Sequence, residues 1–111
     1  MDSEGWGDEV MGRLMWQDAE RFLNQVSTEN GFHCADGRII RSLRELEDAF
    51  AAMSASTFAQ HVSSGKNEFA DWVRDVLGDT QLAQEINEQR NRAHSAKSIA
   101  RRIFFLRSQI V

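Results

Sequence analysis

Apolar residues recur along most of the chain at spacings of three, four and seven, which is the period of an amphipathic helix. The first such stripe predicts a helix from about Asp8 to Glu29, and Asn30-Gly31 supplies residues that commonly end a helix. A denser stripe predicts another helix from Asn67 to Gly78, with glycine as its C-cap. The hydrophobic pattern therefore indicates helices as the main element.

The segment from Phe32 to Ile40 breaks this period. Asp36-Gly37 is typical of a tight turn, and apolar residues flank it on both sides, so a miniature hairpin is possible here. An isolated hairpin this short is marginally stable, so we expect it to pack on helices and to carry few strand residues.

Capping signals set the other helix boundaries. The Ser42 to Glu45 sequence Ser-Leu-Arg-Glu is a capping box, which predicts a helix that starts at Leu43. Ser54 or Ser56 can cap a short helix that follows, and Gly65 ends it.

Asp79 is a predicted N-cap for a last helix that reaches about Ser108. The polar stretch from Asn87 to Ser98 marks the place where this helix can break. Residues 1–111 are thus expected to form one all-α domain of about five helices, with a short turn or mini-hairpin near residues 32–40. The predicted core comprises Leu14, Phe22, Leu46, Phe50, Phe58, Phe69, Trp72, Val76, Leu82 and Ile86.

Length and composition fit this picture. A chain of 111 residues supports one hydrophobic core, and the absence of proline favours helices joined by short turns. The single cysteine, Cys34, excludes an internal disulfide, and no apolar run approaches the ~18 residues of a membrane span. The acidic start of the chain is unlike a signal peptide, so we expect a cytoplasmic protein that does not enter membranes.

Charge is divided unevenly along the chain. Residues 1–89 carry seven basic and seventeen acidic side chains, whereas residues 90–111 carry six basic side chains and no acidic one. The balance is therefore −10 for the first part and +6 for the basic C-terminal helix. Such a split bears on the partners of the domain rather than on its fold.

A run of residues in the second half resembles a known family. The elements are Phe58, His61-Val62, Lys66-Asn67, Phe69-Ala70, Trp72-Val73, Asp75 to Asp79 and Leu82-Ala83, preceded by Asp36-Gly37 and Ser42 to Leu46. They are similar to a small helical domain of archaeal and bacterial proteins that is catalogued as a domain of unknown function. The likeness covers residues 32–103 and leaves residues 1–31 outside it. It implies a helical module, often appended to other domains, without an assigned activity.

Two groups of residues have the chemistry of a site. His33, Cys34 and Asp36 are zinc-ligand types but lack a second pair at ligand spacing, which favours Cys34 as a small buried residue beside a turn. His61 lies near Asn67, Glu68 and Asp71 and can serve in proton transfer, but a hydrogen bond from His61 to the Gly65–Asn67 turn is the favoured interpretation. No nucleophile motif or phosphate loop accompanies them, so we expect no enzyme, no metal and no cofactor.

Aromatic residues divide into two sets. Phe58, Phe69 and Trp72 lie at helical spacing and are expected in the core, and the motif residues His61, Asn67, Trp72 and Asp79 are expected to be structural. Trp6 and Trp16 lie outside the family resemblance, so they are candidates for a partner surface.

The C-terminal helix carries the functional hypotheses. Its apolar residues spread over more than one face, which predicts docking on a second copy or on another protein. The expected interface comprises Trp6, Trp16, Arg101, Arg102, Phe104 and Leu106. The alternative is nucleic-acid binding through the basic helix, with Arg90, Arg92, Lys97, Arg101 and Arg102 as contacts, although the acidic body opposes it.

Overall fold

The computed structural model describes residues 16–89 and 91–110 of the chain. This part contains six α-helical segments and two very short hairpins, joined by turns. The helices are α2 (Trp16–Leu23), α3 (Leu43–Ala52), α4 (Ala55–His61), α5 (Glu68–Trp72), α6 (Thr80–Glu88) and α7 (Arg92–Ser108). A 3-10 turn, η1 (Thr28–Asn30), precedes the first hairpin, and a π-helical turn, η2 (Val73–Leu77), continues α5. The predicted all-α domain is confirmed for this part of the chain.

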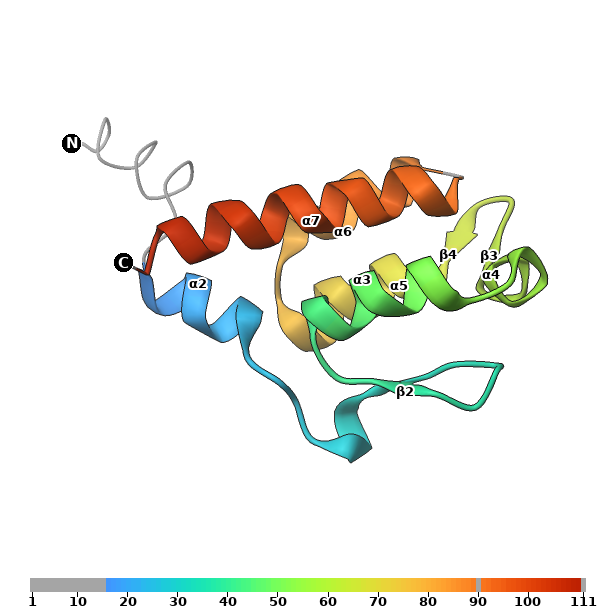
Figure 1. The fold of residues 1–111 in the computed structure, drawn as a ribbon, viewed down its shortest axis with the longest axis horizontal. Coiled ribbons are helices and arrows are strands. Elements are labelled where there is room, and N and C mark those ends of the chain that lie inside the picture. The colour runs from blue at the N-terminus through green and yellow to red at the C-terminus, as the bar shows by residue number, and fades with distance from the viewer. Residues whose placement is uncertain (1–15, 90, 111) are drawn as a thin grey trace.

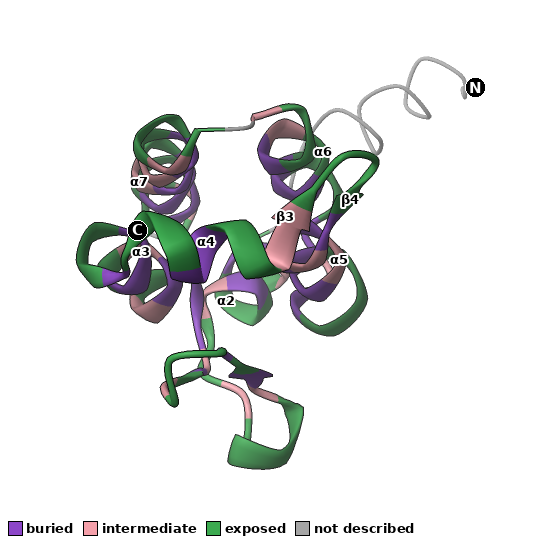
Figure 2. Cartoon of the chain, turned by 90° about the vertical axis from the view of Figure 1, so that its right-hand side faces the viewer, coloured by how far each residue is buried: buried purple, intermediate pink, exposed green. Residues whose placement is uncertain are grey.

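Helix α7 is the longest of the described helices, runs along one side of the molecule and packs on α3, α6 and α2 (Figure 1). The buried faces of these helices turn toward one another, with the exposed faces outward (Figure 2). The first hairpin, β1 (Phe32–His33) with β2 (Ile39–Ile40), lies on the side away from α7 and pairs Phe32 with Ile40. The expected mini-hairpin is therefore present, and it packs on the helices through these two buried residues.

Aromatic rings fill the core between the hairpin and the helices. Phe69 of α5 is fully buried, and its ring centroid lies 4.7 Å from that of Phe32 and 4.9 Å from that of Phe50. Phe58 stacks on it at 5.9 Å. Trp72 is also buried, and its Nε1–H donates to the Asn30 carbonyl at 2.9 Å. These contacts confirm the core role predicted for Phe58, Phe69 and Trp72.

Helix starts follow the predicted caps. Ser42 Oγ accepts the Glu45 N–H at 3.1 Å, and α3 begins at Leu43 as expected. The carboxylate of Glu45 accepts the N–H of Arg41 at 2.8 Å, one residue before the position that a capping box predicts. Ser54 caps α4 through the Thr57 N–H, which decides between the two serines.

The first helix ends earlier than its pattern predicted. Helix α2 stops at Leu23, not near Glu29, because the backbone beyond it pairs with the segment after the first hairpin. The Val26 N–H donates to the Arg41 carbonyl at 2.8 Å, and Arg41 Nε donates to the Val26 carbonyl at 2.7 Å. These bonds use backbone groups that a longer helix would need. Trp6 and Leu14 lie outside the described residues.

The last predicted helix is divided in two. Helix α6 ends at Glu88, and α7 begins at Arg92 with Asn91 as its N-cap, so the break falls within the polar stretch where it was expected. Asn91 accepts the His94 N–H at 3.0 Å. The two helices pack against each other, which brings the N-terminus of α6 close to the middle of α7.

A second hairpin was not predicted. Strands β3 (Val62–Ser63) and β4 (Lys66–Asn67) pair across a turn in which Gly65 has a φ of 77°. The Ser64-Gly65 dipeptide is the sequence signal for this turn, since glycine adopts positive φ without strain. The strands are too short to show an alternating hydrophobic pattern.

Val76 was wrongly predicted to be in the core, because its side chain is 40% exposed. The π-helical turn explains the error. Backbone N–H groups of Gly78 and Asp79 both reach the Val73 carbonyl, so the turn is wider than an α-helical one. This shift keeps Val73 and Leu77 inside while Val76 faces outward.

Ser95 is a buried polar residue whose hydroxyl finds no hydrogen-bond partner among the residues that the structure describes. Its desolvation is therefore uncompensated there. We expect Ser95→Ala to leave the free energy of unfolding unchanged or to raise it by up to about 1 kcal/mol. Urea denaturation followed by circular dichroism measures this change, and a lowered free energy of unfolding would show that the hydroxyl has a stabilising contact.

Candidate functional site

Helix α7 buries one stripe of apolar residues and exposes another. Ile99, Ile103 and Leu106 recur at helical spacing and are buried against the neighbouring helices. Phe104 is 78% exposed and Phe105 is 43% exposed. Leu106 was predicted as an interface residue, and this was wrong because the side chain is fully enclosed in the core.

We call the solvent-facing set on the C-terminal half of this helix and the turn that follows it the α7 outer surface. It comprises Arg101, Phe104, Phe105, Arg107 and Ile110, all of which are exposed. A shallow hollow beside Phe104 is lined by Ala100, Ile103, Arg107 and Ser108 as well. Helix α2 lies at the same end of the molecule, and its first residue, Trp16, is 52% exposed (Figure 1). Phe105 and Arg107 were absent from the predicted interface, although both lie next to residues that it included.

Arg102 is an interior residue, contrary to both functional hypotheses. Its guanidinium donates from Nε to Asp79 Oδ2 at 2.7 Å and from Nη2 to Asp79 Oδ1 at 2.8 Å, and both residues are buried. Asp79 also caps α6 by accepting the Leu82 N–H at 3.2 Å. Position 102 falls on the inward side of the helix beside Ser98 and Leu106, which explains why a charge there needed a partner.

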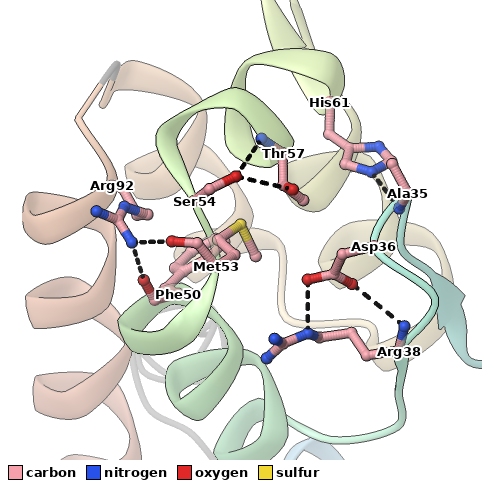
Figure 3. Close-up of polar contacts among 9 residues, drawn as sticks. All are labelled: Ala35, Asp36, Arg38, Phe50, Met53, Ser54, Thr57, His61 and Arg92. Carbon is pink, nitrogen blue, oxygen red and sulfur yellow. Dashed lines mark hydrogen bonds and ion pairs between the residues drawn. The ribbon is translucent and has the colours of Figure 1, made fainter.

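Arg92 also has an internal role. Its Nη1 donates to the carbonyls of Phe50 and Met53, at the C-terminal end of α3 (Figure 3). A cation at this position satisfies carbonyl groups that the helix leaves unpaired. Arg90 lies outside the described residues. Of the five predicted nucleic-acid contacts, Lys97 and Arg101 therefore remain as exposed and described candidates.

His61 holds two parts of the fold together. Its Nε2 accepts the Ala35 N–H at 3.0 Å, and its Nδ1 lies 2.8 Å from Glu68 Oε1 (Figure 3 shows the first contact). Because Nε2 accepts, the proton is on Nδ1, which donates to the carboxylate. The hydrogen bond and then the Lys66 ammonium hold the pKa of Glu68 below its usual value.

This geometry corrects the expectation that His61 bonds the Gly65–Asn67 turn. It also bears on proton transfer. Both imidazole nitrogens are engaged, so accepting a proton from a substrate requires Nε2 to release the Ala35 N–H. Asn67 is likewise occupied, since its side chain caps α5 through the Ala70 N–H and donates to the Ile86 carbonyl.

The residues around Cys34 do not assemble a metal centre in the part of the chain that is described. Cys34 is buried, and burial raises the pKa of its thiol. The carboxylate of Asp36 accepts hydrogen bonds from the backbone N–H and the Nε of Arg38 (Figure 3). The bond from the backbone N–H is the main cause that lowers the pKa of Asp36. Neither there nor elsewhere in residues 16–89 and 91–110 do three or more metal-ligating side chains converge. None of the helices described is long and apolar enough to cross a bilayer.

Comparisons with protein-family models, with curated proteins and with solved structures give no match for this chain. The resemblance to the small helical domain family therefore stays a prediction. What the structure defines is a mainly helical domain in which the motif residues His61, Asn67, Trp72 and Asp79 all make internal contacts. Among the described residues, the most exposed large apolar side chain, that of Phe104, lies on the α7 outer surface.

Proposed function

We propose that this domain is a non-catalytic protein-interaction module that pairs with a second copy of itself through the α7 outer surface. The observation that carries the proposal is the exposure of Phe104, at 78%, with Phe105 and Ile110 also exposed near the same end of the chain. Burying a phenylalanine side chain is worth about 1.5–3 kcal/mol. Adjoining exposed rings are typical of surfaces that bind a partner.

The charges around this surface favour a second copy as the partner. Lys97, Arg101 and Arg107 are exposed on α7 and form no ion pair with any described residue. Exposed acidic residues lie elsewhere, including Glu20 on α2 and Asp48 on α3. One copy therefore carries both halves of a complementary charge pattern.

This distribution also constrains the arrangement. Two α7 outer surfaces placed face to face would bring Arg101 and Arg107 of both copies together, which is unfavourable. A twofold pair in which α7 of each copy lies against α2 of the other brings the basic residues of α7 near Glu20 and buries the exposed aromatics. Trp16, at the start of α2, then joins the interface.

We expect Phe104→Ser to weaken self-association by about 30-fold or more, since an aromatic anchor at the centre of an interface contributes about 2 kcal/mol. The substitution removes apolar area without touching the core, so the circular dichroism spectrum and the urea midpoint should stay unchanged. Sedimentation equilibrium of the full chain over a range of concentrations measures the dissociation constant.

Ile39→Ser is the matched control. Ile39 is an exposed apolar residue of similar size on β2, on the side of the molecule away from α7. This variant should associate as the parent protein does. A parent protein that stays monomeric at high concentration, or a Phe104 variant that associates as tightly as the Ile39 control, contradicts the proposal.

Nucleic acid is the second candidate partner, because Lys97, Arg101 and Arg107 surround an exposed aromatic ring on one helix. Retardation of a single-stranded oligonucleotide at low salt, lost in Arg101→Glu with Arg107→Glu, would favour it. Arg102 is unsuitable for this test. A glutamate at that position would face Asp79 in the interior and would unfold the protein whatever it binds.

A further inference from the structure

We propose that His61 is a proton-sensitive latch: unprotonated, it holds the first hairpin loop, which includes Cys34, against the end of α4, and protonation releases that loop. The inference concerns a different part of the molecule from the α7 outer surface, so it does not depend on the proposed function.

The latch joins two elements that are far apart in the sequence. Ala35 lies in the loop between β1 and β2, and its N–H reaches His61 Nε2 at the end of α4, 26 residues later, at 3.0 Å. The imidazole also contacts the rings of Phe32 and Phe69, with centroid distances of 5.0 and 5.2 Å. The side chain thus stands between the hairpin and the helical core.

Protonation opposes this contact directly. A protonated Nε2 carries a hydrogen of its own, which would face the Ala35 N–H and leave both donors unpaired. The proton therefore binds more readily after the loop has moved away, and by linkage a fall in pH favours release. An imidazole is the side chain that ordinarily changes charge between about pH 5 and 8.

The charged groups around the imidazole come from α5, β4 and the hairpin. The Glu68 carboxylate, on α5, holds Nδ1 and stabilises the imidazolium. The Lys66 ammonium, on β4, lies 3.1 Å from the other oxygen of that carboxylate, and its positive charge opposes this stabilisation. On the hairpin, the Asp36 carboxylate is engaged by Arg38. The contact with Glu68 does not involve the loop, so it remains after release.

Cys34 reports the state of the loop. Its N–H donates to the Arg38 carbonyl at 2.9 Å, and its carbonyl accepts from the Gly37 N–H at 3.0 Å, so it moves with the loop. The side chain is buried, and burial raises the pKa of the thiol, which makes it slow to react while the loop is closed. It is the one cysteine of the sequence, so a thiol reagent reads a single position.

The test measures the reaction of the full chain with 4,4′-dithiodipyridine, a disulfide reagent that also works in mild acid. At each pH the rate is compared with that of the urea-unfolded protein, because this removes the intrinsic effect of pH on the thiol. We expect the protection of Cys34 to fall by about tenfold between pH 8 and pH 5.5, the effect of losing one hydrogen bond. A protection that stays constant over this range overturns the proposal.

Three variants separate the latch from a structural role. His61→Gln offers an oxygen acceptor that does not titrate, so the protection should no longer depend on pH. Glu68→Gln removes the charge that stabilises the imidazolium, so the midpoint should move to lower pH. His33→Gln is the matched control, an exposed histidine on the same hairpin, and it should keep the parent profile.

A pH dependence that survives in His61→Gln, or disappears in His33→Gln, contradicts the proposal. If the His61 variant does not fold, as judged by circular dichroism, a second measurement on the parent protein tests the proposal. Amide hydrogen exchange of Ala35, corrected for its intrinsic rate, should then lose protection over the same pH range as Cys34. Retained protection of that amide at pH 5.5 overturns the latch.

Discussion

Replacing Arg102 with methionine is expected to lower the free energy of unfolding by about 3–5 kcal/mol, because it leaves the buried Asp79 carboxylate without its partner. Asp79 and Arg102 share two hydrogen bonds of 2.7 and 2.8 Å in the interior. Asp79→Asn should have a similar cost, because the guanidinium is then the unpaired charge, although asparagine can still cap α6. Urea denaturation at 25 °C measures both.

The double variant tests whether the pairing itself causes these losses. Asp79→Asn combined with Arg102→Met removes both charges while keeping the cap and the apolar part of the long side chain, so we expect it to recover most of the stability. Arg101→Met is the matched control, an exposed arginine one position away, and its effect should stay within about 0.5 kcal/mol. Additive losses in the double variant would contradict a direct coupling between the two residues.

The helix boundaries were largely predictable because they depend on local chemistry. The side chains of Ser42, Ser54, Asn67 and Asp79 each accept a backbone N–H three residues later, as their spacing implies. The end of α2 was not predictable from its own residues. It is set by hydrogen bonds between Val26 and Arg41, which come together only when the chain has folded.

The candidate site, too, was predictable only where local residues decide its structure. The sequence shows that α7 carries too many apolar residues for one face, but it does not show which of them are buried. Leu106 and Phe104 are two positions apart, which places them about 200° apart around the helix axis, so only one of them can face the core. The contact of α7 with α3 and α6 makes that choice, and it also places Arg102 opposite Asp79.

The burial of charge explains why the nucleic-acid hypothesis looked stronger from the sequence than from the structure. A count of cations cannot distinguish Arg92 and Arg102, which have internal partners, from Lys97, Arg101 and Arg107, which do not among the described residues. Three exposed cations remain on the described part of the basic C-terminal helix, against an acidic body. The balance therefore moves toward a protein partner with acidic residues, which a second copy supplies.

The second large expected effect concerns the aromatic core around Phe69. Phe69→Ala is expected to lower the free energy of unfolding by about 3–5 kcal/mol, because it removes a fully buried ring and leaves a cavity. That ring lies within 6 Å of four other rings, those of Phe32, Phe50, Phe58 and His61, so the cavity would open between the hairpin and three helices. Tight surroundings of this kind collapse poorly, which places the cost toward the upper part of that range.

Val76→Ala is the informative comparison for Phe69→Ala, since the hydrophobic pattern assigned both residues to the core. Val76 is 40% exposed and lies within the π-helical turn, so its truncation should cost less than about 1 kcal/mol. Guanidinium or urea denaturation of the two variants in parallel gives the contrast. Equal losses would mean that Val76 is buried as the pattern predicted and that α5 continues past Trp72 as a regular α-helix. A small loss for Val76 with a large one for Phe69 would instead support the wide turn, which moves this one residue of the apolar stripe outward while Val73 and Leu77 stay buried.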